Sequence, residues 1–151
     1  MEADKVHILI ADDDEGHLIL VQDTLRAIGL DNPVLTFRDG QEILDFLHGV
    51  HPRHHFDPHA SHLLLLDIRM PKLDGVQTLA RIKNDRALRK LPVIMLTTTD
   101  DPREVSRCHE LGCSHYLTKP IDVSQFSQAI SGVGLSISLL RPRAKDVEFV
   151  K

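Results

Sequence analysis

The sequence predicts an α/β fold, a doubly wound sheet of five parallel strands in the order 2-1-3-4-5. Short apolar runs without polar alternation recur along the chain, as in strands that are buried on both faces. Each run is followed by apolar residues at helical spacing, and this alternation favours right-handed crossovers between parallel strands. The 151 residues are enough for one domain with a substantial core.

The first strand is predicted at residues 6–11, and it ends in three carboxylates, Asp12, Asp13 and Asp14. A helix with one apolar face follows and ends at Gly29. Asp14 suits the N-cap of this helix, so at least one of the three acids has an alternative, structural role.

The second strand is predicted at residues 34–37. Asp39 with Glu42 three residues later has the pattern of a capping box for the second helix, which Gly49 ends. Residues 48–62 then form a long loop that contains six histidines.

The third strand, residues 63–66, is a continuous apolar run that ends in Asp67. Pro71 prevents this strand from continuing as a central one, and the Asp-Gly pair at residues 74–75 signals a turn. Asp67 should therefore lie at the carboxyl end of a buried parallel strand, where open α/β sheets hold their sites. A third helix follows and fades near Asp85.

The fourth strand, residues 93–96, is followed by three threonines at residues 97–99. Asp101 as N-cap and Pro102 at the first helical position then begin a helix that Gly112 ends.

The fifth strand is predicted at residues 115–118, and Asp122 with Gln125 caps the fifth helix. The pattern over residues 133–139 fits two structures, because apolar residues at helical spacing also alternate as in a strand. We favour a long fifth helix that reaches about Leu140.

One domain is predicted over residues 1–140, with a polar tail at residues 141–151. The formal net charge of −4 and the lack of a basic helix give no electrostatic footprint for nucleic acid. The apolar runs are far shorter than a membrane span, and residues 1–5 do not begin a signal peptide, so a cytoplasmic location is expected. Cys108 and Cys113 are expected to be reduced packing residues, although their spacing does not exclude a disulfide.

In the predicted sheet, Asp12, Asp13 and Asp67 meet in the crevice between the first and third strands. Converging carboxylates repel one another, and a hard divalent cation such as Mg²⁺ or Mn²⁺ relieves that repulsion. Thr97 offers a hydroxyl donor and Lys119 a positive charge for a phosphoryl group. An aspartate beside a metal and a lysine can attack phosphorus and form an aspartyl phosphate.

This set of residues resembles the receiver domain of two-component response regulators, which has a flavodoxin-like or CheY-like (βα)5 fold. The resemblance covers about residues 6–130 and is carried by Asp12-Asp13, Asp67 with Met70-Pro71, Asp74-Gly75, Thr97 and Lys119-Pro120. It implies that Asp67 accepts a phosphoryl group from a phosphohistidine on a sensor kinase.

The resemblance also implies a ligand set. Asp13, Asp67 and the backbone carbonyl of Arg69 would bind Mg²⁺ directly, and Asp12 would act mostly through water. Many receivers have Asn where this chain has Arg69. In the family, this position and that of Thr99 tune the lifetime of the phosphoaspartate, so we expect a lifetime unlike that of fast-hydrolysing members.

A switch is implied in the same way. Thr97 and Lys119 would hold the phosphoryl oxygens, and the bond before Pro120 would be cis. Phosphorylation would draw Thr97 inward and Tyr116 would rotate, which repacks the face made by the fourth helix, fifth strand and fifth helix.

The long loop before the third strand and the sequence of residues 82–98 resemble the phytochrome-associated single-domain response regulators of bacteria. Such proteins have no output domain and an extended carboxyl-terminal part, and several are dimers through the face just described. We therefore expect two partners, a sensor histidine kinase such as a bacteriophytochrome and a second copy of the chain, and we expect neither nucleic acid nor membrane.

Three alternatives stay open. A haloacid-dehalogenase-like phosphatase also forms an aspartyl phosphate, and Asp12 with Asp14 imitates its motif. A pseudo-receiver that only docks is disfavoured because the acids, Thr97 and Lys119 are all present. The loop histidines are suited to zinc or nickel, but a solvated loop is favoured because they lack defined ligand spacing. These histidines are His51, His54, His55, His59 and His62.

Overall fold

The computed structural model describes residues 6–98 and 101–131. The strands are β1 (His7–Ala11), β2 (Val34–Phe37), β3 (His62–Asp67), β4 (Val93–Thr97) and β5 (His115–Thr118). The helices are α1 (Glu15–Ala27), α2 (Gly40–Leu47), α3 (Gly75–Lys83), α4 (Pro102–Leu111) and α5 (Val123–Ser131). All neighbouring strands pair in parallel, in the predicted order β2-β1-β3-β4-β5.

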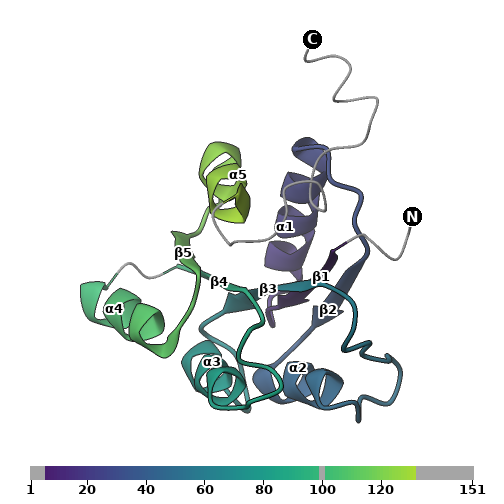
Figure 1. Cartoon of the computed structure of the whole chain (residues 1–151). Coiled ribbons are helices and arrows are strands. Elements are labelled where there is room, and N and C mark those ends of the chain that lie inside the picture. The colour runs from purple at the N-terminus through teal and green to yellow at the C-terminus, as the bar shows by residue number, and fades with distance from the viewer. Residues whose placement is uncertain (1–5, 99–100, 132–151) are drawn as a thin grey trace.

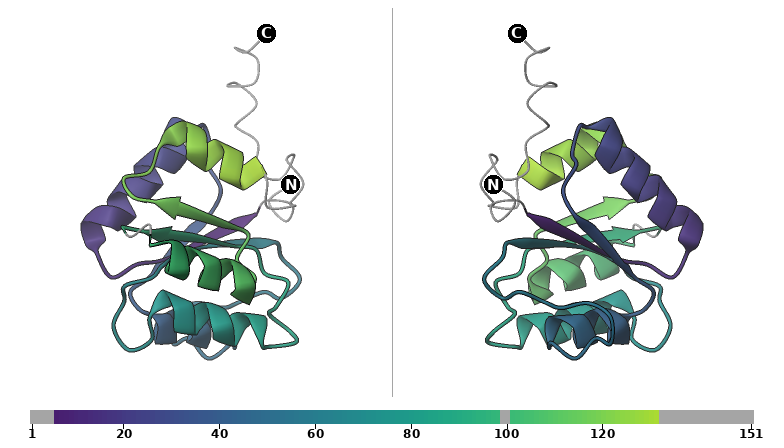
Figure 2. Two further views of the ribbon diagram at one scale, coloured as in Figure 1. Left: turned by 90° about the vertical axis from the view of Figure 1, so that its left-hand side faces the viewer. Right: turned by 90° about the vertical axis from the view of Figure 1, so that its right-hand side faces the viewer.

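The sheet lies between two layers of helices (Figure 1). Helices α1 and α5 cover one face, and α2, α3 and α4 cover the other, as the two side views in Figure 2 show. This arrangement confirms the predicted doubly wound architecture. It also brings the carboxyl ends of all five strands to one edge of the sheet, because the strands are parallel.

Strand β3 contributes to two apolar cores, one on each face of the sheet. Leu63 and Leu65 pack into the core beneath α1 and α5, whereas Leu64 and Leu66 pack into the core beneath the other three helices. Successive side chains of a strand point to opposite faces, so an unbroken leucine run buries itself on both sides. All six residues of β3 are buried, including Asp67.

The predicted N-caps of α1, α2, α4 and α5 all accept backbone N–H groups. They are Asp14, Asp39, Asp101 and Asp122. The capping box predicted for α2 is wrong in one respect, because the Glu42 carboxylate accepts the N–H of Arg38 at 2.7 Å rather than that of the cap itself. A complete capping box occurs instead at α3, between Asp74 and Gln77, where only a turn was predicted.

Most of the histidine-containing loop is exposed, as expected, but the side chains of two of its histidines, His51 and His62, are buried. The His51 side chain is only 1% exposed. Its Nε2 lies 3.0 Å from a carboxylate oxygen of Glu42, and its ring contacts Phe37 and Phe46 edge-on. His62 is buried in β3.

The alternative of a metal site in this loop finds no support in the described part of the chain. Within residues 6–98 and 101–131, the only group of three suitable ligand side chains is formed by Asp12, Asp13 and Asp67. His51 Nδ1 already accepts the backbone N–H groups of Arg53 and His54. This use of both ring nitrogens gives His51 a structural role.

Cys108 and Cys113 are free and buried, as predicted. Burial raises their thiol pKa values to about 11 and about 12, so both remain protonated and unreactive at neutral pH. The described residues include no helix with the length and apolar character needed to cross a bilayer. Thr99 and the chain after Ser131, including the predicted extension to Leu140, lie outside the described residues.

The chain folds back tightly after β3. The Gly75 N–H donates to the carbonyl oxygen of Ile68 at 2.7 Å. A Cβ atom at Gly75 would lie 2.2 Å from the backbone oxygen of Asp67, which is far inside van der Waals contact. Glycine is therefore required here by the close approach of α3 to the strand that carries Asp67.

We predict that Gly75→Ala lowers the free energy of unfolding by about 2–4 kcal/mol, because the backbone on one side of the contact must move. Urea unfolding followed by circular dichroism measures this change. The control is Gly16→Ala in α1, where a Cβ would meet only the Asp14 carboxylate at 3.2 Å. That substitution should change stability by less than about 1 kcal/mol, since alanine favours the helix. Equal stabilities of the Gly75→Ala variant and the wild type would contradict the proposed constraint.

Candidate functional site

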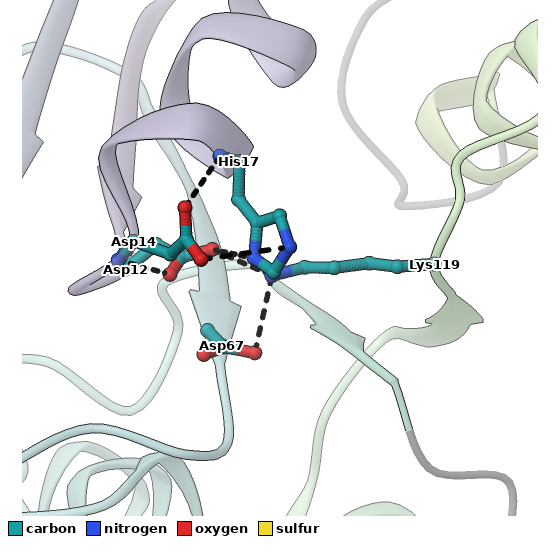
Figure 3. Close-up of polar contacts among 5 residues, drawn as sticks. All are labelled: Asp12, Asp14, His17, Asp67 and Lys119. Carbon is teal, nitrogen blue, oxygen red and sulfur yellow. Dashed lines mark hydrogen bonds and ion pairs between the residues drawn. The ribbon is translucent and has the colours of Figure 1, made fainter.

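The residues of the candidate site lie at the carboxyl ends of four adjacent strands. Asp12 follows β1, Asp67 ends β3, Thr97 ends β4 and Lys119 follows β5. Figure 3 shows Asp12, Asp67 and Lys119 pointing toward one another from three different elements. Residues far apart in the chain are thus brought together by the parallel topology alone.

Three carboxylates form a compact cluster. Asp12, Asp13 and Asp67 each offer an oxygen atom, and these atoms all lie within 4.8 Å of one another. The Asp12 and Asp67 side chains are 3% and 8% exposed, whereas Asp13 is exposed to solvent. Two buried carboxylates and one at the surface suit a hard divalent cation that retains some water ligands. The chemistry of this donor set therefore fits the expected metal.

Lys119 provides the positive charge within the cluster. Its Nζ donates to Asp12 Oδ2 at 2.6 Å and lies 3.4 Å from Asp67 Oδ1. The Lys119 side chain is only 7% exposed. Its backbone N–H donates to the carbonyl oxygen of Thr97 at 2.7 Å, and the Lys119–Pro120 peptide bond is cis. The contacts of Nζ and the backbone hydrogen bond to Thr97 hold a buried ammonium group beside the two buried carboxylates.

Burial has a large effect on Asp67. It raises the pKa of the Asp67 carboxyl from 3.8 to about 6, against the opposing effect of the Lys119 ammonium. The nearby Asp12 carboxylate raises this pKa further. Ionising Asp67 in the folded protein therefore costs free energy, and additional positive charge in the cluster would reduce that cost.

Asp14 is separate from the cluster. Its side chain is 54% exposed and accepts the backbone N–H of His17 as the N-cap of α1. The backbone N–H of Asp14 donates to Asp12 Oδ1 at 2.9 Å, which fixes the orientation of that carboxylate. Asp14 therefore has the structural role that the sequence suggested.

Three further predicted residues lie on β4, on β5 and just after β3. Thr97 is fully buried at the end of β4, directly opposite Thr118 in the register with β5. Tyr116 is half-buried on β5 and packs against the core beneath α2, α3 and α4. Arg69 is exposed, two residues beyond Asp67.

The sequence interpretation missed His17. This residue lies in the first turn of α1, and its Nδ1 is 2.8 Å from Lys119 Nζ. Its position could have indicated a role, because a side chain three residues after the N-cap lies in the first turn of a helix that begins at the site. A single histidine at such a position is too weak a pattern to identify from sequence.

Comparison with known proteins shows what the chain resembles. Residues 8–131 match the family of response regulator receiver domains. The response regulator Rcp1 of Synechocystis sp. is 31% identical over 126 residues, which cover 83% of this chain and 84% of Rcp1.

Solved structures give the same result. The bacteriophytochrome response regulator AtBRR is 34% identical with a TM-score of 0.75, covering 87% of this chain and 94% of AtBRR. The bacteriophytochrome response regulator RtBRR is 30% identical with a TM-score of 0.78, covering 95% and 87% of the two chains. A Mn²⁺-bound structure of Rcp1 is 31% identical with a TM-score of 0.68, covering 83% and 90%.

The raised pKa of Asp67 predicts a pH-dependent stability in metal-free buffer with excess chelator. The folded state binds the Asp67 proton more tightly than the unfolded state does, so protonated Asp67 contributes to the free energy of unfolding. This contribution is complete below about pH 4. It is lost as the pH rises through about 6, where the buried carboxylate ionises. Asp67→Asn should therefore be more stable than the wild type at pH 8, by on the order of 2 kcal/mol.

Urea unfolding at pH 5 and pH 8 measures this difference, which should be about half as large at pH 5, because the unfolded-state carboxyl is already ionised there. The control is Asp23→Asn, an exposed residue of α1 that pairs with Arg26. That variant should differ from the wild type by less than about 1 kcal/mol. A pH-independent effect of Asp67→Asn would show that burial does not penalise the Asp67 carboxylate.

Proposed function

The chain belongs to the family of response regulator receiver domains, and from this premise we propose that Asp67 accepts a phosphoryl group from a sensor histidine kinase, with Mg²⁺ as cofactor. The observation that carries the proposal is the convergence of three carboxylates and the Lys119 ammonium at one edge of the sheet. Mn²⁺ suits the same oxygen ligands.

Phosphoryl transfer at this site is a direct displacement. An Asp67 oxygen forms a bond to phosphorus while the bond from phosphorus to the donor's histidine nitrogen breaks. Lys119, 3.4 Å from Asp67 Oδ1, balances negative charge on a phosphoryl oxygen, and the Thr97 hydroxyl donates to another. Asp13, Asp67 and the Arg69 carbonyl would hold a divalent cation, with Asp12 acting mostly through water, and the cation would supply further positive charge beside the transferred group.

We propose a signalling role without a separate small-molecule substrate, as is general for receivers. Phosphorylation would change the packing around Thr97 and Tyr116, and with it the face made by α4, β5 and α5. Thr97 is buried and Tyr116 half-buried on neighbouring strands, which supports this coupling. Thr99 and Arg69 are the positions that we expect to set the lifetime of the phosphoaspartate.

The three named relatives support a narrower proposal for the partners. Two are described as bacteriophytochrome response regulators. We therefore propose a bacteriophytochrome as the cognate kinase, in the cytoplasm, and a single receiver domain over residues 1–140 with a tail at residues 141–151.

The alternative phosphatase function is disfavoured by one observation. Such an enzyme has its nucleophile on the first strand and would use the motif of Asp12 and Asp14, but Asp14 is engaged as the N-cap of α1. Asp67 on β3, which such an enzyme does not need, is a buried carboxylate whose pKa burial raises to about 6.

We predict that the protein is labelled by acetyl phosphate only when Mg²⁺ is present. Asp67→Asn should abolish labelling, and Lys119→Ala should slow it by about 100-fold, because a transition-state charge partner is lost. The matched control is Asp14→Asn, which preserves a good N-cap outside the cluster and should be labelled normally. Phosphate-specific gel electrophoresis measures all four proteins. Labelling that survives in Asp67→Asn would favour the phosphatase, and labelling in excess chelator would contradict the metal requirement.

We also propose a homodimer through α4, β5 and α5. β5 is an edge strand, and a shallow hollow of about 340 Å³ lies between it and α5, with Gln125 and Gln128 at its side.

Gln128→Arg should weaken the dimer, because two-fold symmetry brings the like charges together. The control is Gln41→Arg on α2. Sedimentation at about 50 µM tests this, and a wild-type protein that is only monomeric would overturn the proposal.

A further inference from the structure

We propose that His17 is a positioning residue, whose ring nitrogen holds the Lys119 ammonium in the orientation needed for phosphoryl transfer to Asp67. This inference rests on the proposed function of Asp67. It assigns a role in that reaction to a residue on α1 that belongs to none of the strand ends.

The first argument is the number of partners around Lys119. An ammonium group has three N–H donors and no acceptor. Three acceptors surround Lys119 Nζ: Asp12 Oδ2 at 2.6 Å, His17 Nδ1 at 2.8 Å and Asp67 Oδ1 at 3.4 Å (Figure 3). His17 Nδ1 is therefore the acceptor of the pair and carries a lone pair rather than a proton.

The second argument is burial. The side chains of Lys119 and Asp12 are 7% and 3% exposed, so a donor without a partner at this depth is costly. The His17 side chain is 34% exposed, which makes it the most exposed of the three partners of Lys119. It also lines a cavity of about 290 Å³ that extends past Lys119 and Pro120. His17 is thus the partner of Lys119 that lies nearest the protein surface.

The third argument is the difference between the three distances. Lys119 is held most closely by Asp12 and His17, and the contact with Asp67 is the longest. An ammonium group placed in this way leaves the oxygens of the nucleophile available. The contact with Asp67 is then the one that is exchanged for a phosphoryl oxygen, while the other two hold the lysine in place.

His17 is itself held firmly enough to act as a support. Its backbone N–H donates to the Asp14 carboxylate at 3.1 Å. The next residue, Leu18, is buried together with Val21 in the core beneath α1. His17 neither gives nor takes a proton in the reaction, in which the bond from Asp67 to phosphorus forms as the donor bond breaks.

The test compares three substitutions in the full chain, with acetyl phosphate and Mg²⁺. His17→Ala removes the acceptor and should lower the initial rate of phosphorylation by about tenfold, the effect of one hydrogen bond to a charged group. His17→Asn should restore most of the rate, because its Oδ1 is two bonds from Cβ, as Nδ1 is in histidine. His17→Gln places its oxygen one bond farther out and should not restore it.

A double-mutant cycle separates positioning from a general structural effect. In a Lys119→Ala background, His17→Ala should have no further effect, because the residue through which it acts is gone. His48→Ala removes an exposed histidine that pairs with Asp85, and it should leave the rate unchanged. Equal rates for His17→Ala and the wild type, or additive effects of the two alanine substitutions, would overturn the proposal.

A crystal structure of His17→Ala distinguishes failure of this inference from failure of the proposed function. Lys119 Nζ should move toward Asp67 and come within about 3 Å of Oδ1, the usual distance of a charge-assisted hydrogen bond. An unchanged lysine position would refute the role of His17. If the wild type is not phosphorylated at all, the proposed function fails, and the position of the lysine still decides whether His17 holds it.

Discussion

The partial neutralisation of two buried carboxylates by one buried ammonium group dominates this site. Asp12 and Asp67 lie at the ends of neighbouring strands, and Lys119 Nζ lies within 3.4 Å of both. Neither carboxylate would be held ionised at such depth without positive charge beside it. Even with the lysine present, burial keeps the pKa of Asp67 at about 6, so a divalent cation and a phosphoryl group have a physical reason to act together here.

The rest of the fold supplies the rigidity that this arrangement needs. The leucines of β3 are fully buried on both faces of the sheet, which fixes the strand that ends at Asp67. Gly75, at the start of α3, approaches the same strand end closely, so the chain that follows β3 is packed against Asp67 as well. A site that depends on precise distances between side chains is therefore carried by a strand that is buried along its whole length.

Polar residues outside the site contribute to packing and to the structure of the loops. Glu42 satisfies the backbone N–H of Arg38 and also pairs with the buried His51. This pair ties the loop after α2 to the start of that helix. The unusual histidine content of the loop is thus explained in part by a buried ring against Phe37 and Phe46, with no need for a metal.

The sequence by itself determined the elements, the sheet order and the four strand ends that carry Asp12, Asp67, Thr97 and Lys119, because unbroken apolar runs and helix caps are local signals. Only the tertiary structure decided contacts that depend on distant segments. The place of His17 beside the lysine joins residues 102 positions apart, and no local pattern encodes it. Burial likewise decided the perturbed pKa of the Asp67 carboxyl, because a side chain's loss of solvent depends on what packs around it.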